Sequence, residues 1–258
     1  MLLFDKEFYI DKDNFSLNNI QLLSDLFLID IETVPQVSNI NELSAEERKL
    51  FFDKISKTMP ENFDEEGAYQ QKAGILAEFG KVICISAGFF YKDKADRTCL
   101  RIKSISGHNE KILLNEFIEI VNKFFRHKNR FQFAGHNIRE FDVPFLCRRM
   151  IINQMSLPAY MHMHGAKPWE ISMTDTMQWW KFGDYKNYIS LHLLATILGI
   201  PTSKDDIDGS MVQHVYYKEN NLPRIVNYCQ KDVITVAQVI QRFKNLPLIE
   251  PENIFIAE

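Results

Sequence analysis

The sequence lacks the features that mark secreted, membrane or disulfide-stabilised proteins. Its 258 residues include only four cysteines, and no two of them form a CxxC pair, so neither a disulfide framework nor a zinc site is indicated. No apolar run approaches the ~20 residues that cross a membrane, and the N-terminus has no signal-peptide layout. These absences favour the reducing cytosol, and we expect a cytoplasmic protein with no membrane partner.

The chain also lacks an excess of positive charge. It has 30 Lys and Arg residues against 34 Asp and Glu residues, which gives a formal net charge of −4. This balance argues against a protein that coats nucleic acid through bulk charge, but it allows one that grips a short strand locally. The globular composition, 46% hydrophobic and 25% charged, predicts one large domain over residues 1–258.

The strongest local pattern is an apolar run that carries two acids, Phe27-Leu28-Ile29-Asp30-Ile31-Glu32-Thr33. It predicts a strand over about 26–33 that is covered on both faces and ended by Pro35. In a strand, Asp30 and Glu32 point to the same side. Two adjacent carboxylates repel each other, and a divalent metal ion between them would remove the repulsion. A strand end with acids facing water is the alternative that these residues alone leave open.

The other periodic segments predict further strands followed mostly by helices. Strands are expected at 82–90 and 98–105, a helix at 109–127, a short strand at 131–134, and helices at 143–153, 190–198, 210–219 and 222–243. The alternation over 98–105 predicts a half-exposed edge strand, and residues 1–25 suggest another edge strand and a turn. This order predicts an α/β fold, a mixed sheet with helices on both faces.

Residues 36–80 read as a helical insertion in this order. Ser44 and Glu47 form a capping box for a helix that runs to about Lys57. A second helix is expected over about 64–78, with Gly80 at its C-terminal end. Because the insertion leaves the strand at the end that carries the two acids, we expect it to lie near them. A plain helical connection and a substrate-contacting lid both remain open.

A third and a fourth acid stand in the second half of the chain. Asp142 follows a predicted buried strand and stands at or near the start of a helix, where it could serve only as a cap. Tyr228 and Asp232 lie four residues apart on the last long helix, hence on one helical face. They border the apolar side of that helix, so they face either a cleft or the solvent.

Taken together, these motifs resemble the DEDD superfamily of 3′–5′ exonucleases, in its tyrosine-bearing subgroup. The likeness spans about residues 26–243 and is nearest to the proofreading exonuclease of family B DNA polymerases. Its elements are Asp30-Ile31-Glu32-Thr33, Gly135-His136-Asn137, the pair Phe141-Asp142, Leu146 and Arg149, Gly199-Ile200-Pro201, and Tyr228 with Asp232. No polymerase sequence follows before Glu258, so we expect a free-standing exonuclease.

The resemblance implies a ribonuclease H-like fold and two Mg²⁺ or Mn²⁺ ions, which suit the two-metal chemistry of phosphodiester cleavage. It implies metal ligation by Asp30, Glu32, Asp142 and Asp232, with Asp30 shared by both ions. Tyr228 would orient the attacking water, since a phenol of pKa ~10 is a poor base at neutral pH. Asn137 and Phe141 would contact the terminal nucleotide, although Phe141 is equally suited to the core.

The expected activity is therefore metal-dependent hydrolysis at the 3′ end of a single-stranded nucleic acid. DNA is the favoured substrate, although discrimination against RNA depends on whether the pocket admits a 2′-hydroxyl. One alternative is a non-catalytic module that binds nucleic acid or protein and keeps the fold. Another is a phosphodiesterase for short RNA oligonucleotides.

Two further signals are expected to be structural. Trp179 and Trp180, next to Lys181, could stack on bases, but the sequence favours core packing for both rings. Asp175 follows a polar stretch and is expected at the end of a strand, and the resemblance gives it no catalytic role.

Overall fold

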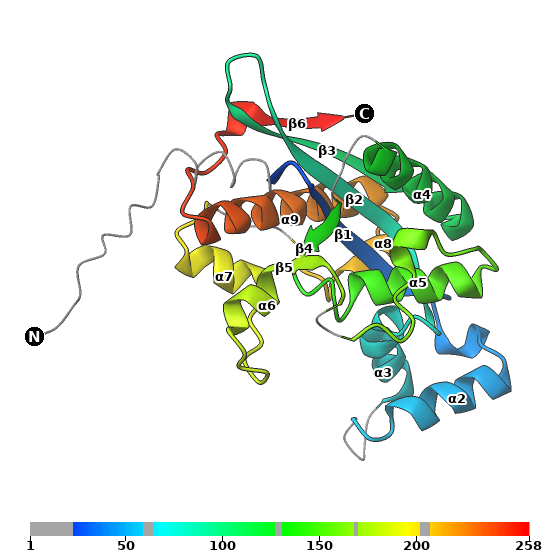
Figure 1. The fold of residues 1–258 in the computed structure, drawn as a ribbon. Helices are drawn as coiled ribbons and strands as arrows, with labels where there is room; N and C mark the ends of the chain where they lie inside the picture. The colour runs from blue at the N-terminus through cyan, green and yellow to red at the C-terminus, as the bar shows by residue number, and fades with distance from the viewer. Residues whose placement is uncertain (1–22, 59–63, 127–130, 168–169, 202–206, 258) are drawn as a thin grey trace, which may run out of the picture.

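A computed structural model describes residues 23–58, 64–126, 131–167, 170–201 and 207–257, and the edge strand suggested for residues 1–25 lies almost wholly outside these ranges. The chain forms one six-stranded mixed sheet with helices on both faces (Figure 1). The predicted α/β class is confirmed, and the arrangement is consistent with a ribonuclease H-like fold. No helix in the described ranges is both long enough and apolar enough to cross a membrane.

The sheet has the strand order β5-β4-β1-β2-β3-β6. Its strands are β1 (Leu26–Pro35), β2 (Gly80–Lys92), β3 (Thr98–Ser106), β4 (Gln132–Gly135), β5 (Met173–Asp175) and β6 (Ile254–Ala257). The first three form an antiparallel meander. β4 pairs parallel with β1, and β5 pairs parallel with β4. The carboxyl ends of β1, β4 and β5 therefore lie at one edge of the sheet.

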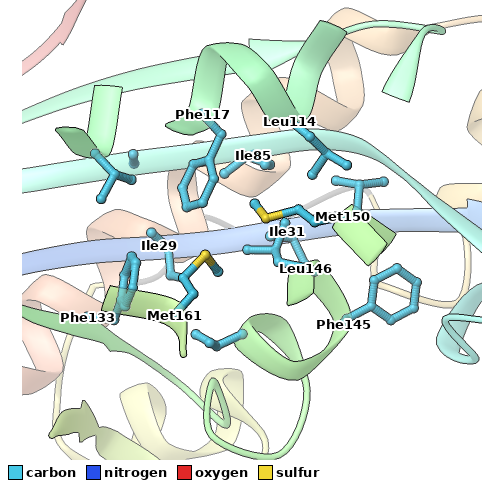
Figure 2. Close-up of a cluster of buried hydrophobic side chains, with 14 of the residues drawn as sticks. Ile29, Ile31, Ile85, Leu114, Phe117, Phe133, Phe145, Leu146, Met150 and Met161 are labelled. Atoms are coloured by element: carbon cyan, nitrogen blue, oxygen red, sulfur yellow. The ribbon is translucent and has the colours of Figure 1, made fainter. Parts of the chain in front are cut away.

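The alternation of β1 divides its side chains between two cores. Ile29 and Ile31 pack with α4 (Glu110–Arg126) and α5 (Asp142–Ile152), where Phe117, Leu146 and Met150 close the cluster. Figure 2 shows these side chains meeting on one side of the sheet. Residues one step along the strand face the opposite side.

That opposite side is covered by α9 (Leu222–Phe243), with α7 (Leu191–Ile197) and α8 (Val212–Tyr217) packed against it. Leu28 of β1 is fully buried there against Val233 and Ala237 of α9. Because Leu28, Asp30 and Glu32 share one face of the strand, the alternation turns both acids toward α9. The buried strand predicted at this position is thus confirmed, and it extends through Pro35 instead of ending before it.

The segment between β1 and β2 contains α2 (Ala45–Ile55) and α3 (Glu65–Lys72). The capping box of Ser44 and Glu47 is present at the start of α2. The second helix is shorter than predicted, because after Lys72 the chain tightens into a 3₁₀ turn, η2 (Ala73–Ile75). The role predicted for Gly80 is wrong. Gly80 begins β2, and a Cβ there would lie 2.8 Å from the carbonyl oxygen of Gly74, so only glycine fits.

The expectation that residues 98–105 form an edge strand is also wrong. The far side of β3 pairs in parallel with β6, from Leu100–Ile254 to Lys103–Ala257. The alternation of polar and apolar residues in β3 does not reveal its pairing with β6. The partner strand lies about 150 positions later in the chain and follows a 3₁₀ turn, η4 (Pro251–Asn253).

Candidate active site

The two acids of β1 lie next to each other and beside a thiol of α9. One ligand atom each from Asp30, Glu32 and Cys229 all lie within 4.8 Å of one another. The Cys229 thiol also donates a hydrogen bond to the backbone oxygen of Asp30, at 3.4 Å. The predicted orientation of the two carboxylates toward one side is therefore present, and α9 contacts the strand at this point.

Burial and mutual repulsion disturb the ionisation of both acids. The pKa of Asp30 is raised well above its ordinary value, first by burial and then by the nearby charges of Asp232 and Asp142. The pKa of Glu32 is raised in the same way, by burial followed by the charges of Asp30 and Asp232. The four predicted acids thus act on one another electrostatically, although they come from three separate elements.

Asp142 does not serve as a simple helix cap. It is the first residue of α5, one position after the N-cap residue Phe141, which makes no side-chain cap hydrogen bond. Its Oδ1 instead accepts a hydrogen bond from the backbone N–H of Ile31 in β1, at 3.1 Å, and only 4% of the residue is exposed. Burial, the largest influence, raises the pKa of Asp142 to about 7. The capping alternative left open by the sequence is therefore wrong, and the side chain joins α5 to the acid-bearing strand.

Tyr228 and Asp232 project from α9 toward the same acids. Both are half-buried, and the Tyr228 hydroxyl is hydrogen-bonded to the Asp232 side chain. Burial and the carboxylates of Asp232, Glu32 and Asp30 raise the pKa of the phenol well above 10. The hydroxyl therefore stays protonated at neutral pH and can act only as a hydrogen-bonding group.

Asn137 has a left-handed backbone conformation, with φ at 62°, and its buried Oδ1 has no hydrogen-bond partner among the described residues. Asp175 holds the turn in place. Its carboxylate accepts the backbone N–H of Asn137 at 2.9 Å and that of Arg139 at 3.0 Å. The same carboxylate accepts the N–H groups of Met177 and Gln178 at the start of α6 (Thr176–Lys181).

Gly135 ends β4 in very close contact with its surroundings. A Cβ there would lie 2.1 Å from the Ile138 side chain and 2.9 Å from the carbonyl oxygen of Ile29. Only a glycine lets the turn after β4 lie this close to β1. This contact brings Asn137 and Asp142 to the end of the acid-bearing strand.

A cleft of about 790 Å³ opens beside Glu32. Its walls come from the end of β1, from α3 and η2, and from α8 with the residues before it. The lining includes Ile31, Thr33, Gln70, Gln71, Gly74, Phe141, Ser210, Gln213, Tyr217 and Lys218. Segment 36–80 therefore lies beside the acids as expected and forms one wall of the cleft. Phe141 lines the cleft and also packs against Phe145, with ring centres 5.4 Å apart, so the core contact is present and contact with a nucleotide stays a prediction.

The acids fit divalent cations by the chemistry of their donors. Asp30 Oδ2 is buried and has no hydrogen-bond partner among the described residues. A buried carboxylate oxygen without a donor is costly, and neighbouring acids add to the cost. Hard divalent ions bind carboxylate oxygens and would remove both penalties. Asp30, Glu32, Asp142 and Asp232 are the residues that could hold them.

Two polar residues at this site were not assigned a role from the sequence. Cys229 stands between Tyr228 and Asp232, and its contact with Asp30 follows from its place on the inner face of α9. Asp175 was expected only to end a strand, which it does. Its role as the cap of α6 could have been predicted, because an Asp before a helical pattern is a sign of a helix cap. Its two other hydrogen bonds could not, because their donors, Asn137 and Arg139, lie 36–38 residues earlier in the chain.

Comparison with family models gives a match over most of the chain. Residues 75–247, about two thirds of the chain, match a family model described as "Predicted 3′-5′ exonuclease related to the exonuclease domain of PolB". The match includes Asn137, Asp142, Tyr228 and Asp232, whereas Asp30 and Glu32 precede it. Comparison with curated protein sequences gave no match.

Among solved structures, the chain is similar to the family B DNA polymerase of the hyperthermophilic archaeon Pyrobaculum calidifontis. The sequences are 13% identical and the TM-score is 0.47. The similarity covers 82% of this chain and 23% of the polymerase, so the chain spans about a quarter of that protein's length.

Proposed function

Because the chain belongs to the family of predicted 3′–5′ exonucleases related to the exonuclease domain of PolB, we propose that it removes nucleotides from the 3′ end of a single-stranded nucleic acid, with DNA as the favoured substrate. We place it in the tyrosine-bearing DEDD subgroup. The observation that carries the proposal is the cluster of mutually repelling, largely buried carboxylates on β1, α5 and α9.

In this proposal Asp30, Glu32, Asp142 and Asp232 hold two divalent ions, Mg²⁺ or Mn²⁺. Two such ions, when bound, supply charge stabilisation for the attacking and leaving oxygens of an in-line displacement. Asp30 is the residue best placed to serve both ions, because it interacts with the charges of Asp232 and Asp142 and keeps a buried oxygen to which no described residue donates. The hydrogen bond from the Ile31 N–H fixes the Asp142 carboxylate beside the strand that carries Asp30 and Glu32.

Tyr228 positions the attacking water in this reaction. Its hydroxyl proton is engaged by Asp232, which leaves the phenol oxygen free to accept a hydrogen bond from a water molecule. The raised pKa of the phenol excludes a role as general base at neutral pH. Tyr228 therefore sets the direction of attack and takes no proton from the nucleophile.

The terminal nucleotide is proposed to lie against Asn137 and Phe141. The Oδ1 of Asn137, which has no partner in the described part of the chain, is an acceptor for a sugar hydroxyl or a base N–H. Phe141 lines the cleft beside Glu32 and offers a ring on which a base can stack. Three glutamines, Gln70, Gln71 and Gln213, make the cleft walls largely neutral, which suits bases better than backbone phosphates.

All four cysteines carry free thiols, which supports a cytoplasmic location.

The test is digestion of end-labelled DNA and RNA strands, with Mn²⁺ or Mg²⁺ and with excess EDTA. We expect stepwise shortening from the 3′ end that stops in EDTA and in Asp30→Ala. Glu119→Ala, an exposed acid on α4, is the matched control and should cleave as the wild type does.

Each alternative has its own outcome in this assay. Binding of strands without cleavage would identify a non-catalytic module. Cleavage restricted to RNA of a few nucleotides would identify an oligonucleotide phosphodiesterase. Full nuclease activity in excess EDTA would reject the metal-dependent reaction.

A further inference from the structure

Three aromatic side chains stand in the solvent on the segment that follows α6. Phe182 is 88% exposed, Tyr185 is 83% exposed and Tyr188 is 63% exposed. We call residues 182–188 the aromatic loop, and Figure 1 shows it projecting from the body of the molecule after α6. Exposed apolar patches on a folded protein often mark interaction or ligand-binding sites, and three large exposed rings lie within these seven residues.

The neighbouring tryptophans do not share this exposure. Trp179 and Trp180 are half-buried and pack against Phe243 at the end of α9, with ring centres 5.9 Å and 6.4 Å apart. The core packing favoured by the sequence is confirmed for both. Next to these tryptophans, the rings that extend into solvent are those of the aromatic loop.

The aromatic loop has a defined shape. Phe182 and Gly183 both have a left-handed backbone conformation, with φ at 45° and 90°. The Asp184 N–H then returns to the Lys181 carbonyl oxygen at 2.7 Å, and the Asp184 side chain accepts the Lys186 N–H at 3.1 Å. A left-handed phenylalanine is unfavourable, and Phe182 gains little from burial, so the strain has no explanation in core packing.

The loop is anchored to the turn that carries the proposed substrate residues. Glu140, two residues before Asp142, accepts hydrogen bonds from the Tyr188 hydroxyl at 3.2 Å and from the Gln178 amide at 2.9 Å. Lys181 forms a salt bridge with the same carboxylate at 3.3 Å, and its ammonium group lies 3.8 Å from the centre of the Tyr188 ring. Tyr188 is thus fixed in place, while Phe182 and Tyr185 extend beyond it.

We propose that the aromatic loop is a stacking platform for the single strand upstream of its 3′ end. This inference rests on the proposed function, because it takes the same strand as its ligand. Stacking on aromatic rings tolerates any base and adds affinity base by base, so it can contribute to strand binding in a chain with a net charge of −4. Asp184, Lys186 and Asn187 separate the rings with polar groups, a pattern less suited to a continuous apolar protein interface.

The platform should extend the binding site without entering the chemistry. A strand of a few nucleotides would fill only the cleft, whereas a longer strand would also reach the rings of Phe182 and Tyr185. Their removal should therefore weaken long strands selectively.

The test compares the wild type with the double variant Phe182→Ala/Tyr185→Ala. Fluorescence anisotropy in EDTA measures binding of labelled oligothymidylate of about 15 nucleotides, and Mn²⁺-dependent cleavage of a trinucleotide reports on the catalytic centre. We expect the affinity for the long strand to fall at least about tenfold, with trinucleotide cleavage unchanged. Both side chains are largely in solvent, so a matching thermal melt is expected to show that the variant folds.

Two control variants sharpen the result. Tyr185→Phe keeps the ring and should bind like the wild type. Phe255→Ala removes a ring that is 43% exposed on β6, away from the aromatic loop, and should also bind normally. Unchanged affinity in the double variant overturns the inference, as does an equal loss in Phe255→Ala. A wild-type dimer in sedimentation that the double variant dissociates, with strand binding intact, would assign the rings to a protein contact and also overturns it.

The same data separate this inference from the proposed function. If the wild type cleaves no strand but the double variant loses binding, the platform stands and the nuclease assignment fails. If the wild type cleaves strands and the double variant binds them normally, the platform alone fails.

Discussion

Asp175→Ala tests whether the turn after β4 depends on one buried carboxylate. Asp175 is 1% exposed, and its two oxygens accept four backbone N–H groups. Loss of a helix cap costs about 0.5–2 kcal/mol, and each buried N–H left without an acceptor costs about 1–3 kcal/mol. Removing the acid also removes its own desolvation cost. We therefore expect the free energy of unfolding to fall by about 3 kcal/mol.

The same change should slow the reaction through displacement of Asn137. Its left-handed conformation is held by the hydrogen bond to Asp175, and a small misplacement of a substrate contact can cost about 10²-fold in rate. Asp175→Asn is the matched variant. Its remaining side-chain oxygen can still accept the N–H groups of Asn137, Met177 and Gln178. Only the Arg139 N–H would face an amide N–H instead of an oxygen, so this variant should lose less stability than the alanine variant.

Urea unfolding and single-turnover cleavage, measured on the same preparations, supply both numbers. An alanine variant within about 1 kcal/mol of the wild type, with a normal cleavage rate, would refute the reasoning. It would mean that water or a shifted backbone satisfies the N–H groups of Asn137 and Arg139 without Asp175.

The remaining predictions concern the acids and the tyrosine. Asp30→Ala should lower turnover by several orders of magnitude. It should also raise the melting temperature in EDTA, because it removes a buried acid that Asp232 and Asp142 repel. A lower melting temperature would contradict this. Tyr228→Phe should slow single turnovers by about 10²–10³-fold with divalent-ion binding intact by calorimetry, and a lost metal site would mean that the hydroxyl holds the helix in place. The pKa of Asp142, raised to about 7, means that the folded state holds more protons than the unfolded state between about pH 4 and pH 7. The metal-free protein should therefore lose on the order of 2 kcal/mol of stability from pH 5 to pH 7, and Mn²⁺ should raise its melting temperature more at pH 8 than at pH 5. Equal stability in EDTA at pH 5 and pH 7, by urea unfolding, would count against the raised pKa.

Elements with a strong local period could be predicted from the sequence. The span of α9 agrees with the expected 222–243, because its apolar residues recur at helical spacing over 22 residues. The orientation of Asp30 and Glu32 toward one face follows from strand alternation. Their proximity to Asp142 and Asp232 was expected from the family resemblance, since no local rule joins residues so far apart in the chain.

What could not be predicted depends on contacts that only the three-dimensional structure shows. The cover over β3 comes from β6, a four-residue strand whose pairing is visible only in three dimensions. The reason for Gly80 is the close approach of Gly74, six residues earlier, and no strand or helix pattern signals it. The exposure of Phe182 and Tyr185 was also hidden, because aromatic residues in a sequence are equally typical of a core.

The hydrogen bonds that β1 makes with distant side chains affect the order of folding. β4 pairs with β1 only over Leu26–Leu28, so beyond that point side chains take the place of a neighbouring strand. Asp142 accepts from the Ile31 N–H across 111 residues of sequence, and Cys229 donates to Asp30 across 199 residues. Contacts of such high sequence separation form late, because the loop entropy must be lost before they are gained. The carboxylates should therefore come together only in the last steps of folding, and a divalent ion should slow unfolding more than it speeds folding.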